Sequence, residues 1–287
     1  MMNPVFRRET QTLLRSFRTF LAIMIYVGVM LLVAFGYVSI SSQGFAYSIE
    51  PRNAIYLYWA LGAFQTALAM IMAPIFAGAS ISGEKERQTL DLMLVSRMSN
   101  FSIITGKLFA SLMTVLLMIV ASLPVFAIML YYGGVSVINL LGLTLFTLLM
   151  SAMTGSIAIL FSVYTKRTIL SIVASLLITI GITMVNLIAT VTTNLLYYNR
   201  YDEALPYIVN KTLISINPGF GYFSLMDSQF GGNLVDSIFD SMTNYFYKGN
   251  TSIILDALPL WANTCIFALA VSALCLFLAT KGLNRRK

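Results

Sequence analysis

Six long runs of apolar residues restrict what this chain can fold into. They extend approximately over residues 20–40, 54–82, 104–131, 137–164, 168–197 and 258–280. A helix of about 20 apolar residues can cross the hydrocarbon core of a bilayer, and each run reaches that length. Of the 287 residues, 58% are hydrophobic and 10% are charged, against about 25% charged in soluble domains. The sequence therefore predicts an all-α membrane protein with six transmembrane helices.

The positions of the basic residues predict how these helices are oriented, because Lys and Arg concentrate in cytoplasmic segments. If the N-terminus is cytoplasmic, 14 of the 18 Lys and Arg residues lie inside, all except Arg52, Arg200, Lys211 and Lys248. Seven of the 11 acidic residues lie outside: Glu50, Asp202, Glu203, Asp227, Asp236, Asp240 and Asp256. An even number of spans then places both termini in the cytoplasm. We expect residues 1–287 to form a single multi-pass transmembrane domain in the cell (inner or cytoplasmic) membrane.

The segment before the first span, residues 3–19, has the pattern of a basic amphipathic helix. Asn3 can cap it and Pro4 suits its first turn. Apolar residues recur at helical spacing on one side, and Arg7, Gln11 and Arg15 lie on the other. This pattern favours an interfacial helix on the anionic inner leaflet. The alternative is a solvated extension of the first span.

Two other segments between the spans are long enough to have a structure of their own. Residues 83–99 read GEKERQTLDLMLVSRMS, with Leu90, Met93 and Leu94 at helical spacing. They predict a short cytoplasmic helix, either a docking site for a partner or a solvated connector. Residues 198–257 form the longest segment, on the outer side, and their many aromatic residues predict an ordered, partly membrane-facing structure, such as short helices packed over the spans. A role of these aromatic residues in substrate binding is the alternative to an ordinary interfacial one.

Several kinds of function are disfavoured by residues that the sequence lacks. With Lys107 counted in a cytoplasmic segment, the six runs contain no Asp, Glu, Lys, Arg or His, although ion-coupled carriers and membrane enzymes usually need such groups. The Gly106-Lys107 pair is followed by leucine and does not match a P-loop. The basic residues, net charge +7, adjoin apolar runs rather than a separate polar domain, so we expect no nucleic-acid binding. We also expect no metal site and no bound cofactor.

The fifth run carries neutral polar residues on one side of the predicted helix. The spacings of 3 and 4 place them within about one third of its circumference. They are Ser171, Ser175, Thr179, Thr183, Asn186, Thr190 and Thr193. Such a stripe suits the lining of a weakly polar pathway or a helix–helix contact, such as a dimer interface. The fourth run has a stripe of small residues that we interpret as packing, namely Thr144, Thr147, Ser151, Gly155, Ala158 and Ser162.

The stretch GEKERQTLDLML at residues 83–94, with Gly106-Lys107-Leu108 opening the next span, resembles permease subunits of the ABC transporter type-2 exporter family. That family typically has six spans, an N-terminal amphipathic helix, a coupling helix between spans two and three, and an elaborated outer segment between spans five and six. The resemblance implies a homodimer or a heterodimer with a paralogous permease, bound to two cytoplasmic ATPase subunits that hold ATP and Mg²⁺. It also implies ATPase coupling through Glu84, Glu86, Arg87, Thr89, Leu90 and Leu94.

The expected function is therefore that of a permease that moves an amphipathic cargo outward by alternating access, without enzyme activity of its own. The alternative is a membrane scaffold that transmits force from a cytoplasmic ATPase to an extracytoplasmic partner. A membrane enzyme would have to use acids of the outer segment, such as Asp227, Asp236 and Asp240. A solvated surface is the more ordinary role of these three residues.

Overall fold

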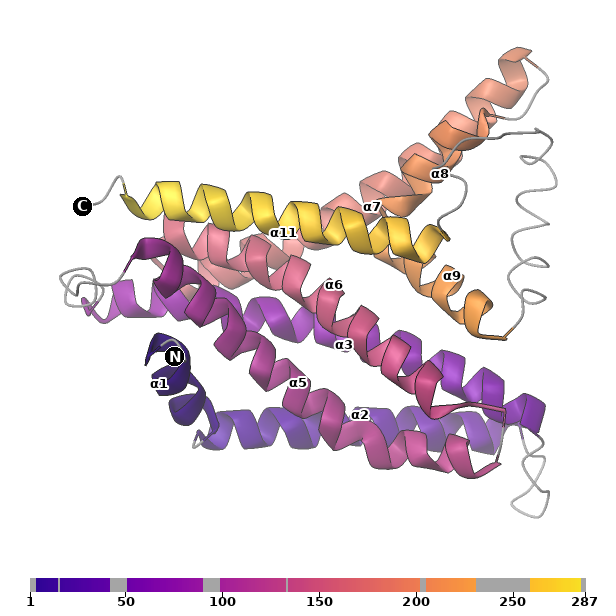
Figure 1. Ribbon diagram of the computed structural model, residues 1–287, viewed down its shortest axis with the longest axis horizontal. Helices are drawn as coiled ribbons and strands as arrows, with labels where there is room; N and C mark the ends of the chain where they lie inside the picture. Colours follow the sequence, from indigo (N-terminus) through magenta and orange to yellow (C-terminus); the bar gives the residue numbers. More distant parts are fainter. Residues whose placement is uncertain are drawn as a thin grey trace. The chain divides into compact units, whose positions relative to one another are not determined.

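Helices make up nearly all of the structure, a computed structural model that describes residues 4–14, 16–41, 51–89, 99–132, 134–201, 205–230 and 259–284 (Figure 1). In chain order they are α1 (Pro4–Leu14), α2 (Phe17–Ser41), α3 (Pro51–Glu86), α5 (Asn100–Tyr132), α6 (Val137–Tyr164), α7 (Thr168–Tyr201), α8 (Tyr207–Ser215), α9 (Pro218–Phe230) and α11 (Leu260–Asn284).

Six of these helices are long and apolar enough to cross a membrane, which confirms the predicted number of spans. They are α2, α3, α5, α6, α7 and α11, and the apolar part of each begins and ends within a few residues of the predicted limits. The fourth span, Val137–Tyr164, coincides with the prediction at both ends. Pro74 and Pro124 lie inside α3 and α5, and both helices continue past them.

The chain divides into two compact units. Unit 1 comprises residues 1–176 and 271–287, and unit 2 comprises residues 177–270. Helices α7 and α11 contribute to both. In unit 1, α3 makes its most extensive contacts with α6, and it also packs against α5 and α2. The short helix α1 packs mainly against α5.

Small residues bring α3 and α6 close together in unit 1. A Cβ atom placed on Gly155 of α6 would lie 3.8 Å from the Cβ atoms of both Ala73 and Ala77 of α3. Small residues at such positions allow two helix backbones to approach in a membrane. The predicted small-residue stripe of the fourth span is therefore a packing surface: Thr147, Ser151, Gly155, Ala158 and Ser162 are all buried.

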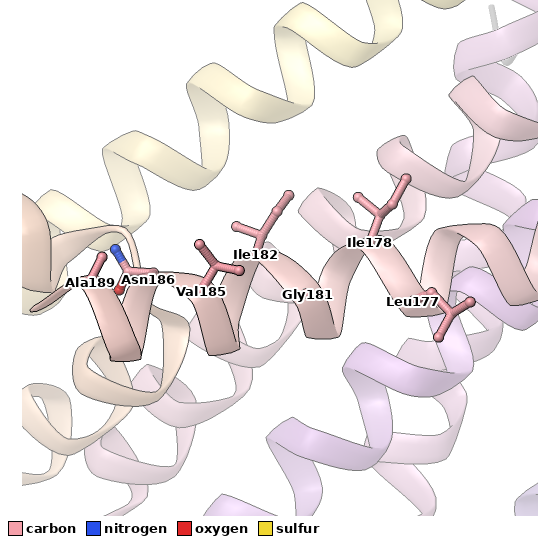
Figure 2. A pocket seen from close by; sticks show the side chains of 7 residues that line it. All are labelled: Leu177, Ile178, Gly181, Ile182, Val185, Asn186 and Ala189. Atoms are coloured by element: carbon pink, nitrogen blue, oxygen red, sulfur yellow. The ribbon is translucent and has the colours of Figure 1, made fainter. Parts of the chain in front are cut away.

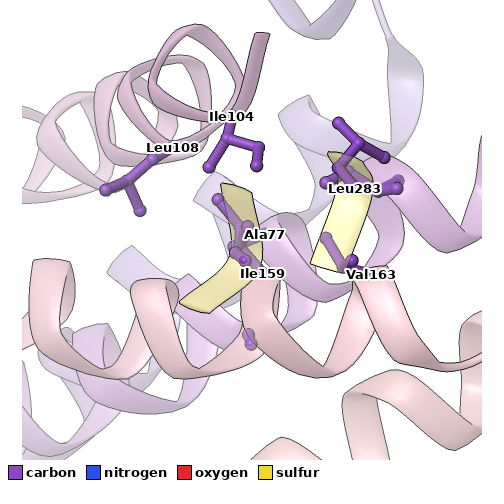
Figure 3. Close-up of a cluster of buried hydrophobic side chains, with 9 residues drawn as sticks. Ala77, Ile104, Leu108, Ile159, Val163 and Leu283 are labelled. Atoms are coloured by element: carbon purple, nitrogen blue, oxygen red, sulfur yellow. The ribbon is translucent and has the colours of Figure 1, made fainter. Parts of the chain in front are cut away.

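Hydrogen bonds join the same two helices along their length. Near one end, Tyr58 donates to the carbonyl oxygen of Asn139 at 3.0 Å. Further along, the hydroxyls of Thr66 and Thr147 lie 3.0 Å apart. Near the other end, the Ser162 hydroxyl donates to the backbone carbonyl oxygen of Gly78 in α3. The side chains of a packed apolar cluster surround this end and come from α3, α5, α6 and α11 (Figure 3).

Unit 2 contains the second part of α7, helices α8 and α9, and the first part of α11. Helices α8 and α9 contact each other. Gly221 of α9 lies directly against Thr264 of α11, since a Cβ on the glycine would approach the threonine side chain to 2.6 Å. Of the segment predicted at residues 198–257, residues 198–201 belong to α7, and α8 and α9 are two further short helices. Residues 202–204 and 231–258 lie outside the described residues.

Candidate functional site: the junction at the end of helix α3

Three consecutive charged residues at the end of α3 each bind a different part of unit 1. Glu84, Lys85 and Glu86 form the last residues of α3, so the first residues of the predicted coupling helix 83–99 belong to α3. Residues 90–98 of that predicted helix lie outside the described residues. We call Glu84, Lys85, Glu86 and their partners the α3 junction.

Lys85 binds the end of α6. Its Nζ atom donates to the carbonyl oxygens of Ser162 at 2.8 Å and of Thr165 at 3.0 Å, and also to that of Val163. The last carbonyl groups of a helix have no partner within the helix and carry partial negative charge, so an ammonium group stabilises them. Lys85 therefore acts as a cap that α3 supplies to α6.

Glu86 binds the beginning of α7. The backbone N–H of Thr168 donates to its Oε1 atom at 2.9 Å, and the Thr168 hydroxyl donates to its Oε2 atom at 2.6 Å. Thr168 is the first residue of α7, and the first N–H groups of a helix attract anions. Lys85 and Glu86 thus hold the end of α6 and the start of α7 with charges of the appropriate sign.

Glu84 binds a lysine that is buried inside α5. The Nζ atom of Lys107 lies 2.9 Å from Oε1 of Glu84, 2.9 Å from Oε1 of Glu9 on α1 and 2.9 Å from the carbonyl oxygen of Ser80. The lysine side chain has 0% exposure, while those of Glu9 and Glu84 have 28% and 23%. Lys107 therefore joins α1, α3 and α5 at one point.

The burial of Lys107 corrects one expectation from the sequence. Lys107 was counted in a cytoplasmic segment, which left the six apolar runs without ionisable residues. In the structure it lies in α5 within the candidate span Asn100–Tyr131, and it is fully buried. The lysine is tolerated there because two carboxylates and a backbone carbonyl neutralise and solvate it.

The backbone leaves α3 through a left-handed residue. Gln88 has a φ of 57°, the N–H of Gln88 donates to the carbonyl oxygen of Lys85 at 3.1 Å, and that of Thr89 donates to the carbonyl oxygen of Glu84 at 2.9 Å. This pair of hydrogen bonds is the Schellman motif, in which glycine usually occupies the left-handed position. The backbone direction after α3 is thus fixed beside the charged residues.

The predicted ATPase-coupling residues have different environments. Glu84 and Glu86 bind other helices of this chain, whereas Arg87 and Thr89 are exposed. Leu90 and Leu94 lie outside the described residues. The coupling role of these six residues stays a prediction, and the two glutamates have internal partners that the sequence pattern did not indicate.

The predicted polar stripe on α7 faces inward, and apolar side chains occupy the exposed side of the helix. Ser171, Ser175, Thr179, Asn186 and Thr190 are buried, and Thr183 is half-buried. The hydroxyls of Ser175, Thr183 and Thr190 donate to carbonyl oxygens of α7 itself. Hydroxyl groups satisfied in this way neither require nor exclude a polar pathway.

Within unit 2, amide side chains join α7 to the helices that follow it. Asn186 donates to the carbonyl oxygen of Leu213 in α8 at 2.9 Å. Asn194 donates to Oδ1 of Asn210 at 3.1 Å. Asn217, just before α9, donates to the carbonyl oxygen of Thr183 at 3.1 Å. Part of the stripe is therefore a contact within this chain.

A shallow groove of about 560 Å³ runs along α7 in unit 2 (Figure 2). Its lining is apolar except for Asn186, whose Oδ1 atom is buried and has no hydrogen-bond partner among the described residues. The lining residues are Leu177, Ile178, Gly181, Ile182, Val185, Asn186 and Ala189. One unsatisfied acceptor in an apolar groove is compatible with either an apolar cargo or another helix.

Sequence reasoning missed Glu9, Lys85, Lys107 and Thr168 as members of a site. Two of them had a signal: Glu9 is the only acid in residues 1–49, and Lys107 interrupts an apolar run. Lys85 and Thr168 had no such signal. Each binds a helix end about 80 residues away in the sequence, and only the folded structure shows which helix ends meet. Among the described residues, no group of three His, Cys, Asp or Glu side chains is placed to hold a metal ion.

Comparison with protein families identifies the class of protein to which this chain belongs. Residues 50–281 match the profile of the ABC-2 family transporter proteins. This chain therefore belongs to the ABC-2 transporter family, as its resemblance predicted, and is a multi-pass membrane permease. The permease domain lacks ATPase activity, and such permeases generally pair with ATPase subunits. Comparison with curated proteins gave no match.

Proposed function

We propose that this chain is the permease subunit of an ATP-driven exporter that moves an amphipathic cargo outward across the cytoplasmic membrane. Peptides, drugs and lipid-linked molecules are the classes of cargo that the mostly apolar, uncharged groove on α7 favours. The permease pairs with a second copy or a paralogous chain, and two ATPase subunits that hold ATP and Mg²⁺ bind on the cytoplasmic side.

The charge distribution supports placing the α3 junction on the cytoplasmic side. Lys85, Lys107, Lys166, Arg167 and Lys281 all lie in unit 1, at or near the ends of the spanning helices. Basic residues at the same end of successive spans favour a cytoplasmic location for that end. This orientation also puts α1, with its exposed Arg7, beside the anionic inner leaflet.

The observation that carries the proposal is the α3 junction itself. The segment between α3 and α5 leaves α3 immediately after residues that bind α5, α6 and α7. A push on this segment by an ATPase therefore reaches several spanning helices through ionic contacts rather than through α3 alone. Movement of these helices closes an inner gate and opens an outer one, which is alternating access.

The internal partners of Glu84 and Glu86 change which residues we propose for the ATPase contact. Arg87 and Thr89 are exposed and follow the junction directly, and Leu90 and Leu94 come next in the sequence. These four residues are the proposed docking surface, while the two glutamates transmit the movement. The stripe from Ser171 to Thr190 remains the proposed lining of the pathway or contact with the second permease.

The test uses the full-length chain purified with its bound ATPase and reconstituted in liposomes. Arg87→Glu should lower the amount of ATPase that co-purifies at least five-fold, because it reverses the exposed charge next to the junction. Glu86→Gln should retain the ATPase but reduce the transport of probe for each ATP hydrolysed. A headgroup-labelled phospholipid and a dansylated amphipathic peptide serve as transport probes.

Three outcomes separate the candidate functions. ATP-dependent outward movement of either probe supports the exporter. ATP hydrolysis that only an extracytoplasmic protein stimulates, with neither probe moved, supports the force-transmitting scaffold. Absence of any bound ATPase from the native membrane preparation would contradict both.

A further inference from the structure

We propose that Lys107 is a positioning residue that makes α1 move together with the segment between α3 and α5. This inference rests on the proposed function, because the movement comes from an ATPase. Its structural part concerns contacts within this chain and can be tested separately.

The geometry of Lys107 satisfies the whole ammonium group. Its three N–H donors have three acceptors at 2.9 Å, from Glu9, Glu84 and Ser80. These acceptors come from α1 and α3, while the lysine belongs to α5. No movement of α1 or α3 away from α5 can occur without leaving a fully buried cation short of a partner.

Glu9 gives α1 a specific attachment point. It is the only acidic residue in residues 1–49, and it points to Lys107 although Arg7 and Gln11 of the same helix are exposed. A helix that is held to a membrane by its basic and apolar faces alone has no need of an inward carboxylate. The ion pair therefore ties α1 to the bundle in addition to whatever the lipid contributes.

Glu84 connects the two helices that flank the proposed coupling segment. Its ion pair with Lys107 joins the end of α3 to the second turn of α5, so the segment between these helices is fastened at its base. Because the same Nζ atom also binds Glu9, the base of this segment and α1 share one anchor. A displacement of the segment is therefore passed to α1.

A buried ion pair is an inefficient way to gain stability alone, since well-packed apolar residues of similar size often do as well. The cluster also contains two carboxylates and one cation, and Oε2 of Glu84 has no hydrogen-bond partner among the described residues. Such an arrangement specifies which groups meet. Positional specificity is the property that transmitted movement requires.

The test follows the exposure of α1 in the full-length permease bound to its ATPase in nanodiscs. Cys265 and Cys275 are replaced by alanine, and Thr10→Cys, at a half-buried position beside Glu9, reports on α1. The rate of modification by a charged maleimide is measured without nucleotide and with ATP and vanadate. Gln11→Cys, at an exposed position of the same helix, is the matched control.

Without nucleotide, Glu9→Gln and Lys107→Met should each increase the modification rate at residue 10 at least five-fold. Lys107→Arg should not, and residue 11 should change less than two-fold in every variant. With ATP and vanadate, the rate at residue 10 should change at least three-fold in the otherwise unaltered chain. Glu9→Gln, which retains Lys107 and one of its carboxylates, should abolish this response.

Unchanged modification at residue 10 in both Glu9→Gln and Lys107→Met would overturn the attachment of α1, whatever the fate of the proposed function. If Glu9→Gln and Lys107→Met increase the modification rate at residue 10 as expected, but ATP and vanadate do not change that rate in the otherwise unaltered chain, the coupled movement is overturned. A preparation with no ATP hydrolysis at all would instead count against the proposed function. If ATP and vanadate still change the modification rate at residue 10 in Glu9→Gln, the role given to the Glu9–Lys107 ion pair is also overturned.

Discussion

The α3 junction in unit 1 and the amide contacts of α7 in unit 2 both bury polar groups, but they do so in opposite ways. The junction uses charges, and each charge binds another helix of the chain. On α7 the buried groups are neutral, and several hydroxyls are satisfied by carbonyl groups of the same helix. A helix whose hydroxyl groups donate to its own carbonyl oxygens can rotate or slide while losing few hydrogen bonds.

This difference assigns opposite mechanical roles to the two regions. Separating α1, α3, α5 and α6 at the junction would leave buried or partly buried charges unpaired, so these four helices should move as one body. The contact of Glu86 with α7 is exposed and adds less. A rotation of α7 in unit 2 would disturb only a few contacts, such as those of Asn186 and Asn194. The junction is therefore suited to transmitting a movement, and the polar face of α7 to responding to one.

Replacing Lys107 with methionine tests the junction most severely. The variant leaves the carboxylates of Glu9 and Glu84 close together without their common cation, and removal of one partner of a buried ion pair lowers the free energy of unfolding by roughly 3–5 kcal/mol. Titration of the purified protein with SDS in mixed micelles measures this change. Lys107→Arg, which retains the charge, should lose less than about half as much.

The control for this interpretation is a second substitution. Adding Glu84→Gln to Lys107→Met removes one of the two facing carboxylates and should recover roughly 1 kcal/mol or more. A lysine that contributed only packing would give additive losses in the double variant instead.

Replacing Asn186 with leucine should have a much smaller effect. The variant loses one hydrogen bond to Leu213, but the carbonyl oxygen of Leu213 keeps another donor in the backbone N–H of Ile216. It also removes the unsatisfied Oδ1 atom and adds apolar surface to the groove. We expect a change in the free energy of unfolding of about 1 kcal/mol or less, measured by the same SDS titration.

A loss at Asn186 as large as that at Lys107 would contradict the contrast between the two regions. Thr192→Val provides the matched baseline on α7, because its hydroxyl donates only within the helix and is exposed. Its effect should be near zero.

The helices could be predicted well from the sequence, whereas the junction could not. Long apolar runs report burial in lipid directly, so the number and limits of the spans follow from hydropathy. The packing of the stripe around Gly155 also follows, because small residues at helical spacing have one common use. These are local properties of the chain.

The charged contacts depend instead on which helix ends meet. GEKER reads as a solvent-exposed segment because its charges match the expected docking role, yet Lys85 reaches the end of α6 and Glu86 the start of α7. The sequence separation in these contacts is 82 residues for Glu86 and Thr168. Hydropathy is a local property of the chain and does not predict which residues so far apart in the sequence come into contact. The burial of Lys107 was not predicted for the same reason, since its partners lie on two other helices.

Replacing Gln88 with glycine changes the backbone of the junction without changing any of its charges. Gln88 occupies the left-handed region with a φ of 57°, which is unfavourable by roughly 1–2 kcal/mol for a residue with a Cβ atom. Glycine removes this strain but loses more entropy on folding, by roughly 0.5–1 kcal/mol. The net expectation is a gain of about 0.5 kcal/mol in the free energy of unfolding.

The order of several variants at this position is more informative than one value. Asparagine tolerates the left-handed region better than glutamine, and valine tolerates it worst, so stability should decrease from glycine to asparagine, glutamine and valine. The SDS titration measures this order, and the nucleotide response at residue 10 measures coupling in the same variants. If valine weakens the coupling while the contacts of Lys107 persist, the direction of the backbone after α3 matters independently of charge. If valine is as stable as glycine, the Schellman turn does not determine how the segment leaves the helix, and the ionic contacts alone define the junction.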